Sequence, residues 1–126
     1  MKKSHWLVCL LGLTLSALLL TAPLAGASTV DPVDKPTVYE FGRRLCPICL
    51  KNALVLEEVR ATYPDQISLR FLYVDTEEHL FRRFGVTFVP TQVFLDAAGN
   101  EVYRHEGPLS KDELIATLKR LNFIRD

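Results

Sequence analysis

The fold is decided by the stretch TVYEFGRRLCPIC, residues 37–49. Its first five residues, Thr37 to Phe41, are mainly β-branched or aromatic, which predicts a strand. The following residues turn the chain into Cys46-Pro47-Ile48-Cys49, and proline is favoured in the first turn of a helix. Helix-forming residues continue from there to Tyr63. A strand that leads into a helix headed by C-x-x-C indicates an α/β domain whose chemistry lies at the start of that helix.

The rest of the chain alternates in the same way. Residues 67–74 form an apolar run, which predicts a strand in the middle of a sheet, because both faces of such a strand are buried. The later expected elements are a short helix ending at Phe84, a strand at 91–95, a strand at 101–105 and a final helix through Leu121, which Ser110 and Glu113 cap. The predicted order is β-α-β-α-β-β-α.

Length and charge limit the function classes. The chain has 126 residues, with 15 Lys and Arg against 15 Asp and Glu, and is 48% hydrophobic. That length suits one domain, and the hydrophobic fraction excludes a disordered chain. Balanced charge without a basic block argues against nucleic acid as a partner.

The first 27 residues have the pattern of a secretory signal peptide. Two lysines near Met1 precede an apolar stretch that begins at Trp6, and Ala25-Gly26-Ala27 provides a cleavage site. The alternative is an uncleaved membrane anchor, because the apolar stretch is just long enough to cross a bilayer. We therefore expect residues 1–27 to be a leader, 28–36 a polar tether and 37–126 the working domain.

Cys46 and Cys49 are spaced for redox chemistry. A disulfide between them closes too short a loop to stabilise the fold much. At a helix N-terminus, unpaired N–H groups favour the thiolate of Cys46, and Arg43 adds positive potential. Cys49, one turn further on, can reach the sulfur of Cys46. An exposed nucleophile with a resolving thiol behind it is what two-step disulfide exchange requires.

A metal site is the alternative use of this pair. Zinc needs four ligands, and apart from carboxylates the expected mature chain offers only His79 and His105 in addition to the cysteines. These histidines fall on different predicted elements without ligand-like spacing. The sequence therefore favours redox chemistry, with a copper-handling protein as the rival from another class.

From residue 37 onward the chain resembles the thioredoxin family. The matching stretches are residues 38–41, Cys46-Pro47-Ile48-Cys49, Val74-Asp75, residues 84–91 and residues 107–111. The resemblance implies a thioredoxin-like α/β fold with a central mixed sheet flanked by helices, which here lacks the family's first strand and helix. It also implies that Pro90 is in cis and faces the cysteines, so that Val89, Pro90 and Thr91 can receive an extended substrate.

Departures from the family pattern surround the cysteines. Leu45 replaces the usual tryptophan, and Pro47-Ile48 replaces Gly-Pro. Glu40 stands where thioredoxin keeps a buried acid behind the second cysteine, so it is expected to exchange a proton with Cys49. The family's lysine partner for that acid is replaced by Phe71. An exposed strand glutamate is the alternative for Glu40.

Together these features predict an exported, periplasmic or membrane-anchored thiol:disulfide oxidoreductase that reduces protein disulfides. Its only expected redox group is the Cys46–Cys49 disulfide, without a metal or other cofactor. We expect a monomer that receives electrons from a membrane donor of the DsbD type, with cytochrome c maturation as a candidate pathway. The alternatives are a disulfide oxidase or isomerase, the metal-handling protein, and a docking module that kept only the fold.

Overall fold

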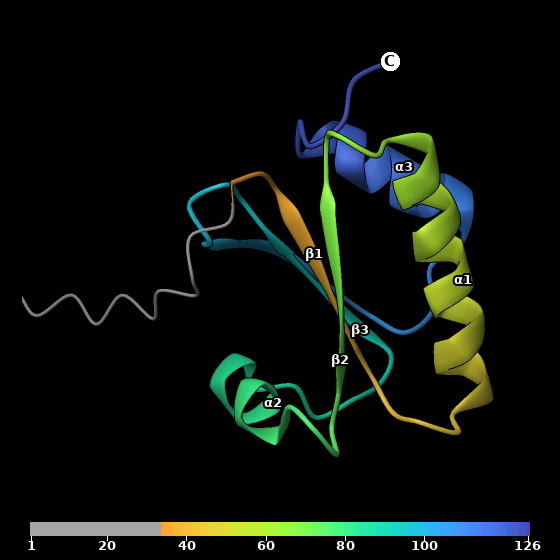
Figure 1. Ribbon diagram of the computed structural model, residues 1–126, viewed down its shortest axis with the longest axis vertical. Helices are drawn as coiled ribbons and strands as arrows, with labels where there is room; N and C mark the ends of the chain where they lie inside the picture. Colours follow the sequence, from red (N-terminus) through yellow and green to blue (C-terminus); the bar gives the residue numbers. More distant parts are fainter. Residues whose placement is uncertain (1–33) are drawn as a thin grey trace, which may run out of the picture.

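A four-stranded sheet in the order β2-β1-β3-β4 lies at the centre of the computed structural model, which describes residues 34–126 (Figure 1). The observed element order confirms the predicted β-α-β-α-β-β-α. The elements are β1 (Thr37–Gly42), α1 (Pro47–Thr62), β2 (Ser68–Tyr73), α2 (Glu78–Phe84), β3 (Thr91–Leu95), β4 (Glu101–Glu106) and α3 (Lys111–Arg120). Strand β1 pairs in parallel with β2 and antiparallel with β3, so the sheet is mixed, as predicted.

The expected leader, residues 1–27, and the expected tether as far as residue 33 lie outside the described residues. Within the described part of the chain, no helix is long and apolar enough to cross a membrane.

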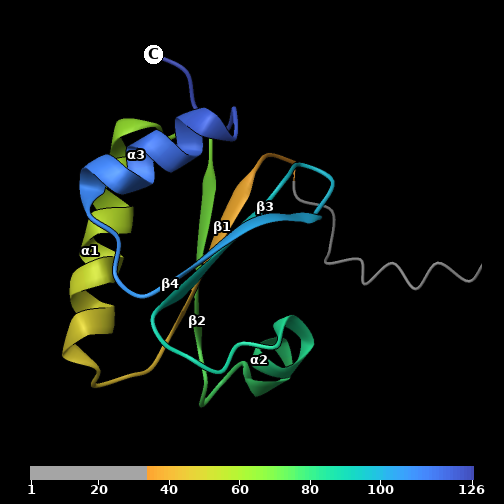
Figure 2. The same ribbon diagram turned by 180° about the vertical axis from the view of Figure 1, so that it is seen from behind.

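The helices cover both faces of the sheet. Helices α1 and α3 pack side by side on one face, and α2 lies on the other, as the two opposite views show (Figures 1 and 2). Successive side chains of a strand point to opposite faces. Val38 of β1 therefore packs in the cluster under α1 and α3, whereas Tyr39 and Phe41 pack in the cluster with α2. Glu40 is two residues after Val38 and therefore points to the same face, towards α1. Because β1 is buried along its whole length, this side chain lies inside the protein.

The expectation that residues 67–74 lie in the middle of the sheet is wrong. Strand β2 is an edge strand within the described residues, and only Leu72 of it is fully buried. Its remaining apolar side chains are half-buried: Leu69 packs under α1, and Phe71 lies beside Leu50 of α1. An apolar run indicates that the two faces of a strand are covered, but it does not indicate whether another strand lies on each side.

The predicted capping box begins α3. The Ser110 hydroxyl accepts a hydrogen bond from the Glu113 main-chain N–H, and the Glu113 carboxylate accepts one from the Ser110 N–H. These bonds satisfy donors that a helix start leaves unpaired. Helix α3 is thereby held beside α1, where Leu114 and Leu118 complete the larger core cluster.

We predict that Ser110→Ala lowers the free energy of unfolding by about 1 kcal/mol, because the N-cap acceptor is lost. Urea unfolding of the oxidised protein measures this. Ser68→Ala is the matched control, since the Ser68 hydroxyl makes no hydrogen bond within residues 34–126. Equal losses in the two variants would show that the cap contributes nothing specific.

Candidate active site

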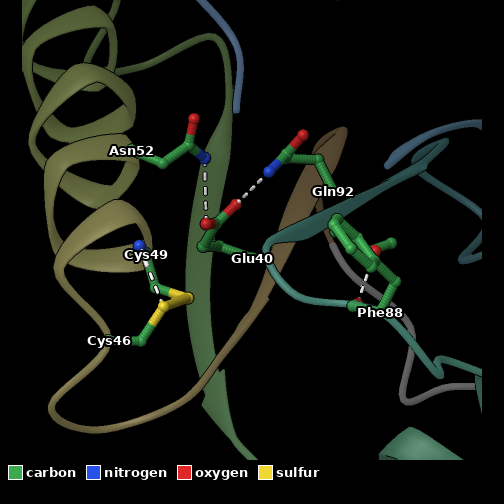
Figure 3. Close-up of a disulfide and its surroundings, with 7 residues drawn as sticks. Glu40, Cys46, Cys49, Asn52, Phe88 and Gln92 are labelled. Atoms are coloured by element: carbon green, nitrogen blue, oxygen red, sulfur yellow. Dashed lines mark hydrogen bonds between the residues drawn. A yellow bond between two sulfur atoms is a disulfide. The ribbon is translucent and has the colours of Figure 1, made fainter. Parts of the chain in front are cut away.

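Cys46 and Cys49 form a disulfide at the start of α1, with their Cα atoms 5.3 Å apart (Figure 3). Cys46 is the N-cap residue, and its sulfur accepts a hydrogen bond from the Cys49 N–H at 3.3 Å. Pro47 occupies the first turn, where its missing N–H costs no hydrogen bond. Cys46 is half-buried, whereas Cys49 is only 4% exposed. An outside disulfide can therefore reach Cys46 more readily than Cys49.

The surroundings of Cys46 favour negative charge. The first turn of α1 contains no acidic residue, so its free N–H groups and the helix dipole act on the sulfur unopposed. Arg43 is exposed and lines a narrow cavity that Cys49 also lines. Arg44 is engaged elsewhere: its guanidinium pairs with Asp75 at 2.8 Å and lies 5.0 Å from the centre of the Tyr73 ring.

Glu40 is buried behind the disulfide. Its side chain is held between two amides, one from α1 and one from β3 (Figure 3). Asn52 Nδ2 donates to Oε1 at 2.9 Å, and Gln92 Nε2 donates to Oε2 at 2.8 Å. Its register neighbour on β2 is the uncharged Phe71. Glu40 is only 3% exposed, so the alternative of an exposed strand glutamate is wrong.

Burial controls the acidity of Glu40. Loss of solvation raises the pKa of its carboxyl from the ordinary value of 4.5 to about 7, although the hydrogen bonds from Asn52 and Gln92 act in the opposite direction. The group can therefore both take up and release a proton near neutral pH.

Glu40 and Cys49 both line one narrow cavity, whose volume is about 10 Å³. That volume corresponds to about one water molecule. Gly42 closes one side, and a Cβ atom there would lie 3.6 Å from the Cβ of Cys49. Glu40 and Cys49 are therefore placed so that a proton can pass between them through this cavity.

The loop before β3 contains a cis proline and leaves the backbone groups of the preceding residue without hydrogen bonds within residues 34–126. The Val89–Pro90 peptide bond is cis, Val89 is half-buried and Pro90 is buried. The loop is held in place because Thr91 Oγ1 donates to the Phe88 carbonyl at 2.8 Å and the Gly107 N–H donates to the Pro90 carbonyl at 2.8 Å. Within residues 34–126, the N–H and C=O of Val89 make no hydrogen bond.

Exposed apolar side chains lie near the start of α1 and in the loop before β3. Leu45 is 95% exposed and has a φ of 60°, a left-handed conformation that is uncommon for a leucine. Ile48 and Phe88 are also exposed, at 47% and 53%. Such residues beside a reactive group form a surface on which an apolar segment of another protein can bind.

The histidines lie on different elements. His79 is on α2 and exposed, and His105 is on β4, where its ring nitrogen lies 3.4 Å from the Pro108 carbonyl. Among the described residues, no group of three or more His, Cys, Asp or Glu side chains is arranged to hold a metal ion.

Sequence reasoning missed Asn52 and Gln92. Asn52 follows Cys49 by three residues, so helical spacing puts it on the same buried face of α1. Gln92 is a polar residue in the mainly apolar strand β3, and its position opposite Glu40 depends on sheet register. A polar residue on a predicted buried face was the available signal in both cases.

The thioredoxin-like domain family matches residues 27–122. The chain belongs to the thioredoxin-like family. The chloroplastic thioredoxin-like protein HCF164 of Arabidopsis thaliana is 33% identical over 89 residues, covering 69% of this chain and 34% of that protein. Thioredoxin of Alicyclobacillus acidocaldarius is 32% identical over 85 residues, covering 68% of this chain and 80% of that protein.

Solved structures agree with this membership. A malaria parasite thioredoxin-2, described as a component of protein secretion machinery, superposes with a TM-score of 0.67 at 25% identity, covering 74% of this chain and 89% of that one. The chain spans about a third of the length of the first curated relatives that it matches. Family, fold and the C-x-x-C pair together support thiol:disulfide oxidoreductase chemistry.

We predict that Glu40 makes the protein less stable as the pH rises. Between pH 4.5 and 7 the folded protein keeps a proton on Glu40 that the unfolded chain releases, so folding binds more protons and stability falls with pH. The free energy of unfolding should fall by about 2 to 3 kcal/mol from pH 5 to pH 8 because of this group. Urea unfolding of the oxidised protein at several pH values measures the slope.

Glu40→Gln should flatten that slope, since the variant has no proton to lose. Glu57→Gln, which removes a solvent-facing carboxyl from α1, is the control and should keep the wild-type slope. A Glu40→Gln protein with the wild-type slope would contradict the raised pKa.

Proposed function

We propose that this chain is an extracytoplasmic thiol:disulfide oxidoreductase that reduces disulfides in other proteins. The observation that carries the proposal is the placement of the two cysteines: Cys46 is accessible at the N-cap of α1, and Cys49 is buried directly behind it. This asymmetry assigns the attack on substrate to Cys46 and the release of product to Cys49.

The reaction begins with the reduced protein. The Cys46 thiolate attacks one sulfur of a substrate disulfide, and the other substrate sulfur leaves as a thiolate. Before this attack the Cys46 thiolate is stabilised by the N-terminal N–H groups of α1, including that of Cys49, and by the positive charge of Arg43. The product of this step is a mixed disulfide between Cys46 and the substrate.

The second step releases the substrate. Cys49 transfers its proton to the Glu40 carboxylate, directly or through one water in the shared cavity. The Cys49 thiolate then attacks the sulfur of Cys46, and the second substrate sulfur leaves. Two electrons have passed to the substrate, which is now a dithiol, and this chain holds the Cys46–Cys49 disulfide.

Substrate binding is assigned to the loop around Pro90 and to the exposed apolar residues. The N–H and C=O of Val89, which make no hydrogen bond within residues 34–126, can accept an extended substrate segment as one added strand. Leu45, Ile48 and Phe88 offer apolar contacts to the same segment. Main-chain pairing of this kind suits unfolded or loop segments of varied sequence.

The reducing direction is supported by the dipeptide between the cysteines. Pro47 and Ile48 carry neither a histidine nor a charge that would stabilise the Cys46 thiolate further. Strong thiolate stabilisation is what makes a dithiol protein an oxidant, because it favours the reduced form.

The location and the electron source are proposed on the basis of the predicted leader. Residues 1–27 support export, either to a periplasm as a cleaved protein or to the outer side of a membrane as an anchored one. A reductant outside the cytoplasm needs electrons from across the membrane, for which a donor of the DsbD type is suited. Cytochrome c maturation, which requires reduced thiols, is the pathway that we propose for its substrates.

Trapping of the mixed disulfide tests this function. In the full chain with Cys9→Ser, the further change Cys49→Ser should trap a mixed disulfide with insulin, because no resolving thiol is present. A reducing agent should cleave this adduct. The Cys46→Ser protein should give no adduct and no insulin reduction.

The control is the protein with both cysteines, which should reduce insulin catalytically in the presence of dithiothreitol. Catalysis by Cys46→Ser at the rate of this control would contradict the assigned nucleophile.

A further inference from the structure

A row of polar side chains crosses the α1 face of the sheet. Glu40 of β1 lies in register with Gln92 of β3, and Gln92 lies in register with His105 of β4. Gln92 therefore lies between the buried carboxyl and the far edge of the sheet. It is completely buried, Asn52 is 1% exposed, and both amides donate to Glu40.

The two amides differ in their second contacts. The Asn52 oxygen, Oδ1, accepts a hydrogen bond from the Leu109 N–H at 2.7 Å, so Asn52 joins Glu40 to the segment before α3. The Gln92 oxygen, Oε1, is buried and has no hydrogen-bond partner within residues 34–126. Buried polar atoms are nearly always paired, so this unpaired oxygen needs an explanation.

The observed hydrogen bonds match the ionised form of Glu40. An ionised carboxylate accepts at both oxygens, and both oxygens have an amide N–H. A protonated carboxyl carries one O–H, which needs an acceptor inside the protein. For Asn52 to accept it, the Asn52 amide would have to turn over, which would break the hydrogen bond from the Leu109 N–H. Gln92 can supply an acceptor, because its oxygen is free.

We propose that Gln92 is a positioning residue that follows the proton on Glu40 by turning its side-chain amide over. With Glu40 ionised, Gln92 Nε2 donates to the carboxylate. With Glu40 protonated, the amide is reversed and Gln92 Oε1 accepts the Glu40 O–H. Asn52 is the fixed donor in both states. This inference rests on the proposed role of Glu40 as the proton acceptor for Cys49.

The reversal keeps Glu40 bonded through the exchange step. When the Cys49 proton reaches Glu40, the new O–H forms a hydrogen bond to Gln92 instead of facing an amide N–H. When Glu40 loses the proton to water, the amide returns. A buried polar group left without a partner is costly, so both forms of the carboxyl are stabilised by the same residue.

Other titratable groups lie around this network. Arg43, Cys49 and Tyr73 line the cavity that Glu40 lines, Lys51 lines a hollow with Asn52, and His105 lies in register with Gln92. In the oxidised protein the two cysteines do not titrate, so that form isolates the response of Glu40.

The first test uses Gln92→Met, which keeps the volume and removes the amide. Carbon-13 NMR of the oxidised full chain with Cys9→Ser measures the Glu40 midpoint, which is expected near 7 in the parent protein. In Gln92→Met it should rise by about one unit or more, because a hydrogen bond to a charged group is stronger than one to a neutral group. The midpoint of the pH profile for substrate release should rise with it.

Gln66→Met is the matched control. Gln66 bonds the backbone of Arg125, far from Glu40 in the chain, and its loss should leave both midpoints unchanged. An unchanged Glu40 midpoint in folded Gln92→Met would overturn the proposal.

The second test needs no variant. In the parent protein, the side-chain amide resonances of Gln92 should titrate with the Glu40 midpoint, and the contact from the Gln92 amide hydrogens to Glu40 should disappear below it. The Asn52 amide should keep its contact at every pH. A Gln92 contact that persists at low pH would contradict the reversal.

The role of Glu40 as proton acceptor and the reversal of the Gln92 amide can be disproved separately. If Glu40→Gln leaves the pH profile of substrate release unchanged, Glu40 is not the proton acceptor for Cys49. The amide titration of Gln92 would still report whether the side chain follows the Glu40 proton.

Discussion

A carboxyl group in the middle of a fully buried strand is the constraint on which the site depends. Glu40 has hydrophobic neighbours along β1, and its two amide partners come from α1 and β3. Holding it inside requires those elements to stay in register, and the Asn52 bond to Leu109 extends the requirement to the segment before α3. Burial of this group raises its pKa into the range where it can accept a proton from a thiol.

The start of α1 gives the two cysteines different environments, because Cys46 is accessible at the N-cap and Cys49 is buried. Cys46 lies at the N-cap, where unpaired N–H groups favour its charged form, and Cys49 lies one turn deeper against the strand that carries Glu40. In the proposed exchange, Cys46 is therefore suited to attack without help, whereas Cys49 needs a base. Two-step exchange requires this order, because the resolving thiol must stay protonated until the mixed disulfide has formed.

Local patterns predicted most of the fold and only part of the site. The run at 37–41 and the C-x-x-C pair predicted β1 and the start of α1, because residue type and spacing report local structure and burial. The edge position of β2, the pairing of Arg44 with Asp75 and the bond from Gln92 to Glu40 depend on which segments become neighbours. Helical spacing could have found Asn52, but sheet register was needed for Gln92.

If the Cys46–Cys49 pair transfers electrons to substrates, its reduction potential should lie in the range of reducing dithiol proteins. Equilibration of the full chain with Cys9→Ser against a dithiol of known potential should give a value near that of thioredoxin, about −270 mV. A value near that of a strong oxidant, about −120 mV, would contradict the reducing direction and favour disulfide formation. Failure to form a reversible disulfide would contradict the redox function itself.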